Sequence, residues 1–243
     1  SRLNLKNIYV QRENRRFYPL NSLAAHVLGG VNVDGEGQSG VELQYNARLE
    51  GVKGLSLILR DANKRRYDWE ILKEPEPGQD LVLTLDETIQ YIAERELEKA
   101  VREHEASWGT VLISHPASGE ILAMATCPTY DPNDYPPSPF ELARNRTIQE
   151  NFEPGSMFKI VTAAAAREAG AVGFNEHFDC SEGKIRVAGW TISDHKKMGV
   201  LTFSEVIIHS SNVGTIKVGQ RVGQDNLYRM IQDFRFGQKT GLD

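Results

Sequence analysis

A proline-glycine pair followed by an unbroken apolar run limits what the middle of this chain can form. Pro154 and Gly155 break any element that precedes them, and residues 160–166 continue as small or apolar residues. The sequence therefore predicts a helix that begins near Ser156 and is apolar enough for complete burial. Lys159 follows Ser156 by one turn, so both side chains share a face. A lysine amine removed from water loses its proton more readily and can act as the base for the serine hydroxyl.

The spacing S-x-x-K is weak evidence by itself, because residues 181–184 and 193–196 also match it. The first of these copies contains Gly183, which breaks a helix, and the second lies in a polar run. Ser156 alone opens an apolar helix, and it is therefore the candidate nucleophile. The alternative is that Ser156 caps this helix and that Lys159 is a solvated residue of its first turn.

A second polar group follows the apolar run at residues 203–208. The triplet Ser210-Ser211-Asn212 would place a hydroxyl and an amide together at the end of a helix formed by that run. In a serine acyl-transfer site, the hydroxyl relays a proton between the base and the leaving amine, and the amide binds the peptide backbone of the substrate. The alternative is a polar C-terminal cap, a position that Asn favours.

Together the two groups resemble the active-site serine family of penicillin-binding proteins and serine β-lactamases, whose motifs are S-x-x-K, an S-x-N-like triplet and K-T-G. The sequence around both motifs is similar to penicillin-binding proteins and not to β-lactamases. The segments that carry this similarity are 81–86, 118–125, 128–133, 145–148, 152–159 and 210–214. The resemblance covers nearly the whole chain.

The first part of the chain resembles the pedestal of class B enzymes, the monofunctional transpeptidases, and most of all their division-specific subgroup. The segments that carry this resemblance are 16–19, 24–29, 40–45 and 49–51. The resemblance implies an α+β chain in which residues 1–75 belong to a small mixed α/β pedestal of the dimerisation type. Residues 76–243 would then form the front portion of the transpeptidase domain, whose antiparallel sheet is flanked by helices.

The tripeptide Lys239-Thr240-Gly241 matches the third motif but lies in the wrong context. It follows a predicted helix at residues 227–231 and a glycine-terminated exit, whereas the motif of the family lies on a strand much farther along the chain. We expect Lys239 to have no catalytic role and the true third motif to lie beyond Asp243. Class B enzymes also begin with a membrane-spanning helix, so the chain is expected to be incomplete at both ends.

Composition excludes several classes of protein. The chain is 40% hydrophobic and 25% charged, which fits a globular body with a proper core. Its net charge of -5 provides no broad basic field, so no nucleic acid is expected as a partner. The histidines lack the spacing of metal ligands, and neither a metal nor an organic cofactor is expected. Cys127 and Cys180 are interpreted as free thiols, with a disulfide as the alternative.

Local patterns predict the elements that frame these motifs. Ser39 and Glu42 match a capping box for a helix closed by Gly51. Residues 55–60 and 67–72 match a hairpin that turns at 61–64.

After a boundary at residues 74–78, apolar residues recur at helical spacing from Asp86 to Val101. Residues 110–114 and 120–126 then match a hairpin that supplies the first two strands of the sheet. Two strands cannot cover the apolar helix after Ser156, so we expect an isolated chain to be unstable or to take cover from a neighbouring molecule.

The resemblance implies a peptidoglycan cross-linking D,D-transpeptidase that acts on D-Ala-D-Ala stem peptides. Ser156 would be the nucleophile, Lys159 its base, Ser210 the proton relay and Asn212 the group that orients the peptide. β-Lactams would acylate Ser156. The protein would be periplasmic, anchored to the bacterial cytoplasmic membrane, and would have membrane-embedded cell-wall synthesis proteins as partners. The alternatives are a non-catalytic penicillin-binding scaffold or sensor module and a hydrolase of the same superfamily, against which the pedestal argues.

Overall fold

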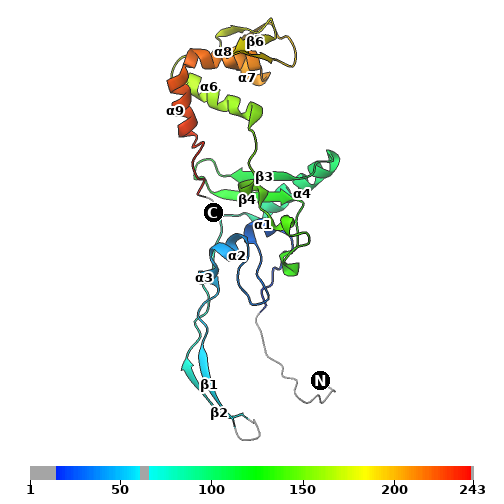
Figure 1. The fold of residues 1–243 in the computed structure, drawn as a ribbon, viewed down its shortest axis with the longest axis vertical. Coiled ribbons are helices and arrows are strands. Elements are labelled where there is room, and N and C mark those ends of the chain that lie inside the picture. The colour runs from blue at the N-terminus through cyan, green and yellow to red at the C-terminus, as the bar shows by residue number, and fades with distance from the viewer. Residues whose placement is uncertain (1–14, 61–65, 242–243) are drawn as a thin grey trace. The chain divides into compact units, whose positions relative to one another are not determined.

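The computed structural model describes residues 15–60 and 66–241 of the chain. By contacts the chain forms two compact units, Ser1–Glu150 and Asn151–Asp243. Figure 1 shows the order of their helices and strands. Within the described ranges, no helix has both the length and the apolar character that a bilayer crossing requires. The predicted domain boundary between residues 75 and 76 stays a prediction.

The first unit begins with three short helices: α1 (Ala25–Leu28), α2 (Gly40–Gln44) and α3 (Asn46–Leu49). The predicted capping box is wrong. Ser39 stands at the N-cap of α2, but its hydroxyl accepts the N–H of Gly30 at 3.1 Å. The buried Glu42 carboxylate accepts instead from Arg16 Nε at 2.6 Å and from the Tyr18 hydroxyl at 3.2 Å. Tertiary partners have therefore taken both capping groups.

The chain leaves α3 through Gly51, whose φ of 69° lies in the left-handed region that glycine favours. The single helix predicted before Gly51 is divided into α2 and α3. Strands β1 (Leu55–Arg60) and β2 (Arg66–Lys73) then pair antiparallel, with Ile58 opposite Trp69. The predicted hairpin is confirmed, and its turn at residues 61–64 lies outside the described residues.

The core of the first unit lies between a helix and a hairpin. Helix α4 (Glu87–Glu103) packs on strands β3 (Gly109–Ser114) and β4 (Ile121–Cys127), as Figure 1 shows. The contact buries Ala93 and Leu97 against Ala123 and Ala125. Asp86 caps the helix by accepting the N–H of Ile89 at 2.8 Å. The helix and the hairpin predicted from periodicity are both confirmed.

The buried Gln90 of α4 joins this helix to the neighbouring strand. Its amide group donates to the carbonyl of Met124 at 2.9 Å and accepts the N–H of Met124 at 2.8 Å. A buried amide must find such partners, because leaving it unpaired costs about 1–3 kcal/mol. In the described part of the chain, β3 and β4 pair only with each other.

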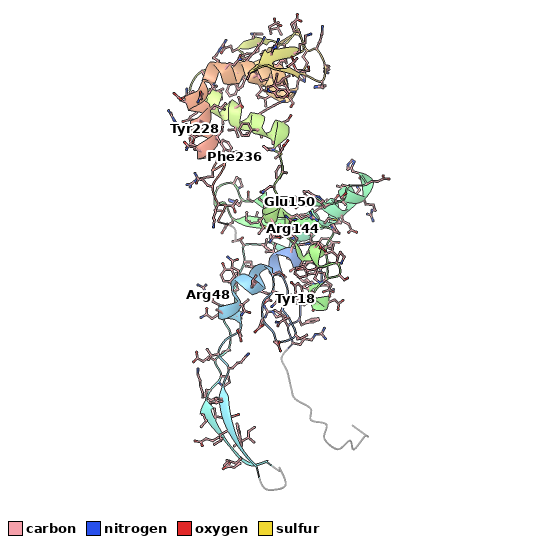
Figure 2. All side chains as sticks on the ribbon, in the orientation of Figure 1. Tyr18, Arg48, Arg144, Glu150, Tyr228 and Phe236 are labelled. Carbon is pink, nitrogen blue, oxygen red and sulfur yellow. The ribbon has the colours of Figure 1, made fainter. Side chains whose placement is uncertain are left out.

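The remaining helical elements of the first unit, within the described residues, are η1 (Pro132–Asp134), η2 (Phe140–Ala143) and α5 (Arg146–Gln149). His26 of α1 is 5% exposed, and its Nε2 lies 2.8 Å from the Leu142 carbonyl oxygen. Burial lowers the pKa of His26. Arg144 and Glu150 form an ion pair at 3.3 Å, and both are labelled in Figure 2.

The second unit is built from helices around two small antiparallel ribbons. Its helical elements are η3 (Gly155–Phe158), α6 (Lys159–Glu168), α7 (Phe203–Ile208), α8 (Asn212–Val222) and α9 (Gln224–Asp233). Its ribbons pair β5 (His177–Asp179) with β8 (Val200–Thr202), and β6 (Lys184–Val187) with β7 (Trp190–Ser193). The core residues are Ala165, Ala166, Val172, Phe178, Cys180, Leu201, Phe203, Val206, Val213, Val218 and Val222.

Helix α6 is covered along one side only. Val161, Thr162, Ala165 and Ala166 are buried, whereas Ile160 is 60% exposed. The complete burial for which the apolar run is suited is not reached, because the described elements cover only part of the helix surface. This agrees with the incomplete cover expected from the sequence.

Candidate active site

Ser156 lies where the predicted helix begins. Gly155 has a φ of 53°, and the turn that starts there, η3, runs directly into α6. The first residue of α6 is Lys159, whose backbone N–H donates to the carbonyls of Ser156 and Met157. In such a tight turn, side chains three residues apart lie nearly in line. The Ser156 side chain is exposed, and among the hydrogen bonds of the described residues it makes none with the Lys159 amine.

The Lys159 amine contacts Ser210, which lies 51 residues farther along the chain. The Lys159 Nζ atom donates to the Ser210 carbonyl oxygen at 2.6 Å and to the Ser210 Oγ atom at 2.9 Å. Ser210 has a φ of 54°, an uncommon conformation for a residue with a side chain. Burial lowers the pKa of the Lys159 ammonium, and the carboxylate of Asp194 acts in the opposite direction. A lysine with a lowered pKa releases its proton more readily and is better suited to act as a base.

The triplet Ser210-Ser211-Asn212 forms a corner between two helices. It lies after α7, and its middle residue is the N-cap of α8, so Asn212 begins a helix and does not end one. The C-terminal cap considered for Asn212 is therefore wrong. Ser211 is completely buried and accepts the N–H of Gly214 at 2.9 Å. The Asn212 amide donates to the carbonyl of Ser193 at 2.8 Å.

Asp194 holds this corner from the segment that follows β7. Its Oδ2 atom accepts the Ser211 hydroxyl at 2.8 Å. Its Oδ1 atom accepts the N–H groups of Asn212 at 2.5 Å and Val213 at 3.1 Å. The sequence did not identify Asp194, because it lies in the polar run 193–196 that was set aside as a chance copy of S-x-x-K. No local pattern connects this residue to a triplet in another part of the chain.

The structure thus brings Lys159, Ser210 and Asn212 to one end of α6 and α8, with Ser156 one turn before the lysine. An amine within hydrogen-bond distance of a hydroxyl can pass a proton to it, as a serine acyl-transfer site requires. Because Ser156 is exposed, its hydroxyl is accessible from solvent. No cluster of three or more potential metal ligands occurs in the parts of the chain that the structure describes.

The lysines of the other candidate motifs do not take the place of Lys159, although Ser193 and Asp194 of one S-x-x-K copy contact the corner. Lys184 and Lys196, from the two remaining S-x-x-K copies, are both exposed. Lys239 is also exposed and lies in irregular backbone after α9, beyond a turn that closes at Gly237 with a φ of 77°. Phe236 of this turn, labelled in Figure 2, packs edge to face on Phe158 at 5.4 Å. The interpretation of this region as a helix with a glycine exit is confirmed.

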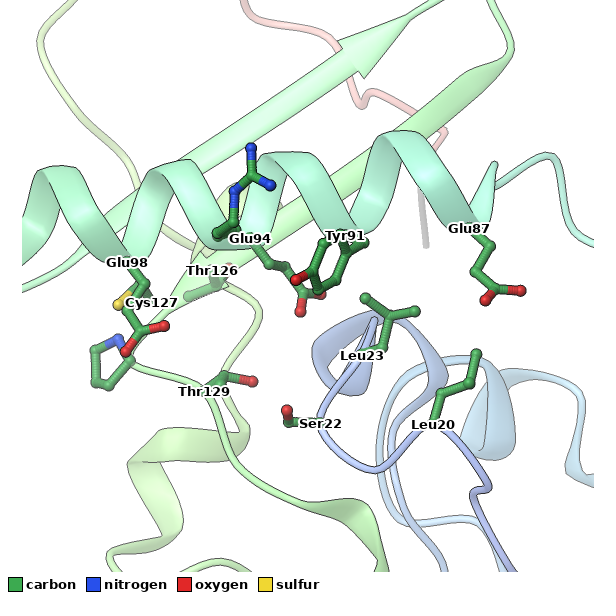
Figure 3. A pocket seen from close by; sticks show the side chains of 12 residues that line it. Leu20, Ser22, Leu23, Glu87, Tyr91, Glu94, Glu98, Thr126, Cys127 and Thr129 are labelled. Carbon is green, nitrogen blue, oxygen red and sulfur yellow. The ribbon is translucent and has the colours of Figure 1, made fainter.

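A pocket of about 650 Å³ lies in the first unit and contains none of the four predicted site residues. Figure 3 shows side chains from α4, from the loop before α1 and from the end of β4 around it.

Both Cys127, which lines this pocket, and Cys180 are free thiols, as interpreted from the sequence.

Comparison with known proteins places these observations in a family. Residues 109–243 match the penicillin-binding protein transpeptidase domain, and residues 1–83 match the penicillin-binding protein dimerisation domain. The chain belongs to the penicillin-binding transpeptidase family. The expected transpeptidase fold, preceded by a pedestal of the dimerisation type, is confirmed.

Two curated relatives show where the similarity lies. The chain is 36% identical to stage V sporulation protein D of Bacillus subtilis over 249 residues, which cover 99% of the chain and 38% of that protein. It is 33% identical to the peptidoglycan D,D-transpeptidase FtsI of Escherichia coli over 241 residues, covering 99% of the chain and 41% of that protein. The chain therefore spans about two fifths of the length of these relatives.

A solved structure of a penicillin-binding protein is also similar to this chain in three dimensions. Penicillin-binding protein 3 of Mycobacterium tuberculosis, in complex with ampicillin, superposes with a TM-score of 0.81 at 34% sequence identity. The superposition covers 94% of this chain and 48% of that one.

Proposed function

We propose that the full-length protein is a peptidoglycan D,D-transpeptidase that works through a serine acyl-enzyme. The observation that carries this proposal is the contact of the Lys159 amine with the Ser210 hydroxyl, in a chain of this family. Lys159 lies one turn after Ser156. The name of the E. coli relative supplies the substrate, which is peptidoglycan.

In the proposed acylation, the Ser156 Oγ atom forms a bond to the carbonyl carbon of the penultimate D-alanine in a stem peptide. Lys159 takes the proton of the Ser156 hydroxyl, and the amide C–N bond to the terminal D-alanine breaks. Ser210 passes a proton from Lys159 to the departing amine. The Ser156 backbone N–H stabilises the oxyanion, and the Asn212 amide orients the peptide.

In the second step, an amine of a neighbouring stem peptide attacks the ester carbonyl. A new C–N bond forms, the bond to Ser156 Oγ breaks, and the proton of the amine returns to the serine through the same groups. A β-lactam would acylate Ser156 in place of the peptide. The action would take place at the extracytoplasmic face of the bacterial membrane, beside membrane-embedded proteins of cell-wall synthesis.

The alternative function is a penicillin-binding scaffold or sensor that does not turn over peptides. The tripeptide at Lys239 is not on a strand, so this alternative would gain support only if the full-length protein had no third catalytic motif.

Acylation by a fluorescent penicillin tests the proposal in the full-length protein. We expect a stable adduct on Ser156, located by peptide mass spectrometry, and its loss in Ser156→Ala. Ser181→Ala is the matched control, because it removes an exposed serine from another S-x-x-K copy and should leave the adduct unchanged. Cross-linked product from stem peptides supports the transpeptidase. An adduct without cross-linking supports the scaffold, and rapid release of hydrolysed penicillin supports a hydrolase.

A further inference from the structure

Asp194 accepts the first two backbone N–H groups of helix α8 at the candidate site, and Ser211 accepts the third. Its two oxygen atoms accept three hydrogen bonds, from the Ser211 hydroxyl and from the N–H groups of Asn212 and Val213. Hydrogen bonds to an ionised acceptor are about twice as strong as those between neutral groups. A carboxylate at a helix N-terminus also interacts favourably with the helix dipole. The single side chain of Asp194 therefore fixes the corner that carries Ser210 and Asn212.

Backbone groups at the end of β7 also hold Asp194 beside the corner. The backbone N–H of Asp194 donates to the Gly183 carbonyl at 2.9 Å, and the carbonyl of its neighbour Ser193 accepts the Asn212 amide. Two consecutive residues thus hold both the backbone and the side chain of Asn212. Since Ser210 is two residues away, a shift of this corner would move the hydroxyl away from the Lys159 amine.

Asp194 is also the charged group that acts on Lys159. Other titratable groups on the elements packed against α6, with His209 at the C-cap of α7, are Glu205, His209, Lys217, Arg221, Asp225, Tyr228, Arg229 and Asp233. Three of these have other partners: Glu205 accepts from Thr202, Lys217 donates to the Asp179 carbonyl, and Arg221 pairs with Glu176. Of the charges on described residues, that of Asp194 opposes the effect of burial by raising the pKa of Lys159.

We propose that Asp194 is a positioning residue of the acylation reaction, which holds the Ser210-Ser211-Asn212 corner in register with Lys159 and sets the charge environment of that lysine. The inference rests on the proposed function. Asp194 acts through its neighbours and does not itself touch the substrate.

Two substitutions separate position from charge. Asp194→Asn keeps the shape and the oxygen that accepts two backbone N–H groups, but removes the negative charge. Without that charge the pKa of Lys159 falls further, so acylation should reach half of its plateau at a lower pH than in the wild type. Asp194→Ala also removes the hydrogen bonds, and a misplaced reacting group can lower a rate by about 10²-fold. We therefore expect a plateau rate about 10²-fold lower for Asp194→Ala and a smaller loss for Asp194→Asn.

The experiment measures the rate of penicillin acylation of Ser156 from pH 5 to 10 in the full-length protein, with thermal unfolding of each variant. Asp179→Asn is the matched control, because its carboxylate accepts from the Ser181 N–H and does not contact the corner. A pH profile that moves in Asp194→Asn and stays unchanged in Asp179→Asn supports the inference. An unchanged profile in Asp194→Asn overturns it, even if Asp194→Ala is slow, because lost folding stability alone does not move the profile. A wild type that reacts at no pH refutes the proposed function and this inference with it.

Discussion

Two glycines of helix α8 should respond to the same substitution in opposite directions. A methyl group at Gly214 would lie 2.5 Å and 2.8 Å from the two Cγ atoms of Val206, which is completely buried. A methyl group at Gly219 would have Thr162 Cγ2 as its nearest neighbour, at an ordinary 3.8 Å. Gly214→Ala and Gly219→Ala therefore change helix propensity equally and differ only in packing.

The magnitudes follow from these distances. Alanine is favoured over glycine within a helix by about 1 kcal/mol, so Gly219→Ala should stabilise the second unit by up to that amount. At Gly214 the methyl cannot fit without displacing Val206, whose branched side chain has few alternative rotamers. Overpacking of this kind costs about 1–3 kcal/mol, which exceeds the gain in propensity. We expect Gly214→Ala to destabilise the unit by up to about 2 kcal/mol.

A double mutant tests the cause. Val206→Ala alone removes two buried methyl groups, at about 0.8 kcal/mol each before any cavity cost. Combined with Gly214→Ala, it opens the space that the new methyl needs, so the double mutant should be more stable than the sum of the single effects by about 0.5–3 kcal/mol. Amide hydrogen exchange of Val218 and Val222 in the full-length protein reports the unfolding of this unit. Equal stabilisation by Gly214→Ala and Gly219→Ala, or strict additivity in the double mutant, would refute the reasoning.

Three further predictions concern titratable groups. Because burial lowers the pKa of His26, this histidine binds a proton more readily in the unfolded chain than in the folded one. The first unit should therefore be most stable above the ordinary histidine pKa of about 6.5 and should lose stability as the pH falls. Hydrogen exchange should show a smaller loss of stability at low pH in His26→Gln than in the wild type. Glu42→Gln removes the charge that pairs with Arg16 and should lower the free energy of unfolding, measured in urea, by about 1–3 kcal/mol. The control Glu70→Gln, at an exposed position, should lower it by less than about 0.5 kcal/mol. Lys159→Arg should abolish penicillin acylation in a gel assay, because the guanidinium group stays protonated and cannot act as a base. In the wild type, the acylation rate should rise with pH and reach half its plateau below the ordinary lysine pKa of 10.5.

Elements that depend on neighbours in sequence could be predicted. The apolar spacing of α4 and the hairpin β3–β4 were both identified, since each is set by residues within one turn or one strand pair. The start of α6 was found from Pro154 and Gly155 for the same reason. The capping box at Ser39 failed because Glu42 found a stronger partner in Arg16, which no local pattern reveals.

The candidate site could be predicted only in part. Its residue types came from family motifs, but the contact between Lys159 and Ser210 is a tertiary one, and no spacing rule predicts a distance between separate elements. The corner between α7 and α8 was misplaced, because a polar triplet can end one helix as readily as begin the next. Asp194 was missed because a carboxylate after a short strand resembles any solvated turn residue.

The middle residue of the Ser210-Ser211-Asn212 corner is completely buried, whereas the residues on either side of it are the ones proposed to act in the reaction. Ser211 belongs to the same interior as Cys180 and Val206. The positions of Ser210 and Asn212 therefore depend on how well the hydrophobic core around Ser211 is packed. If β-lactams acylate Ser156 as proposed, selection for tolerance to them should also recover substitutions at buried positions that the drug does not contact.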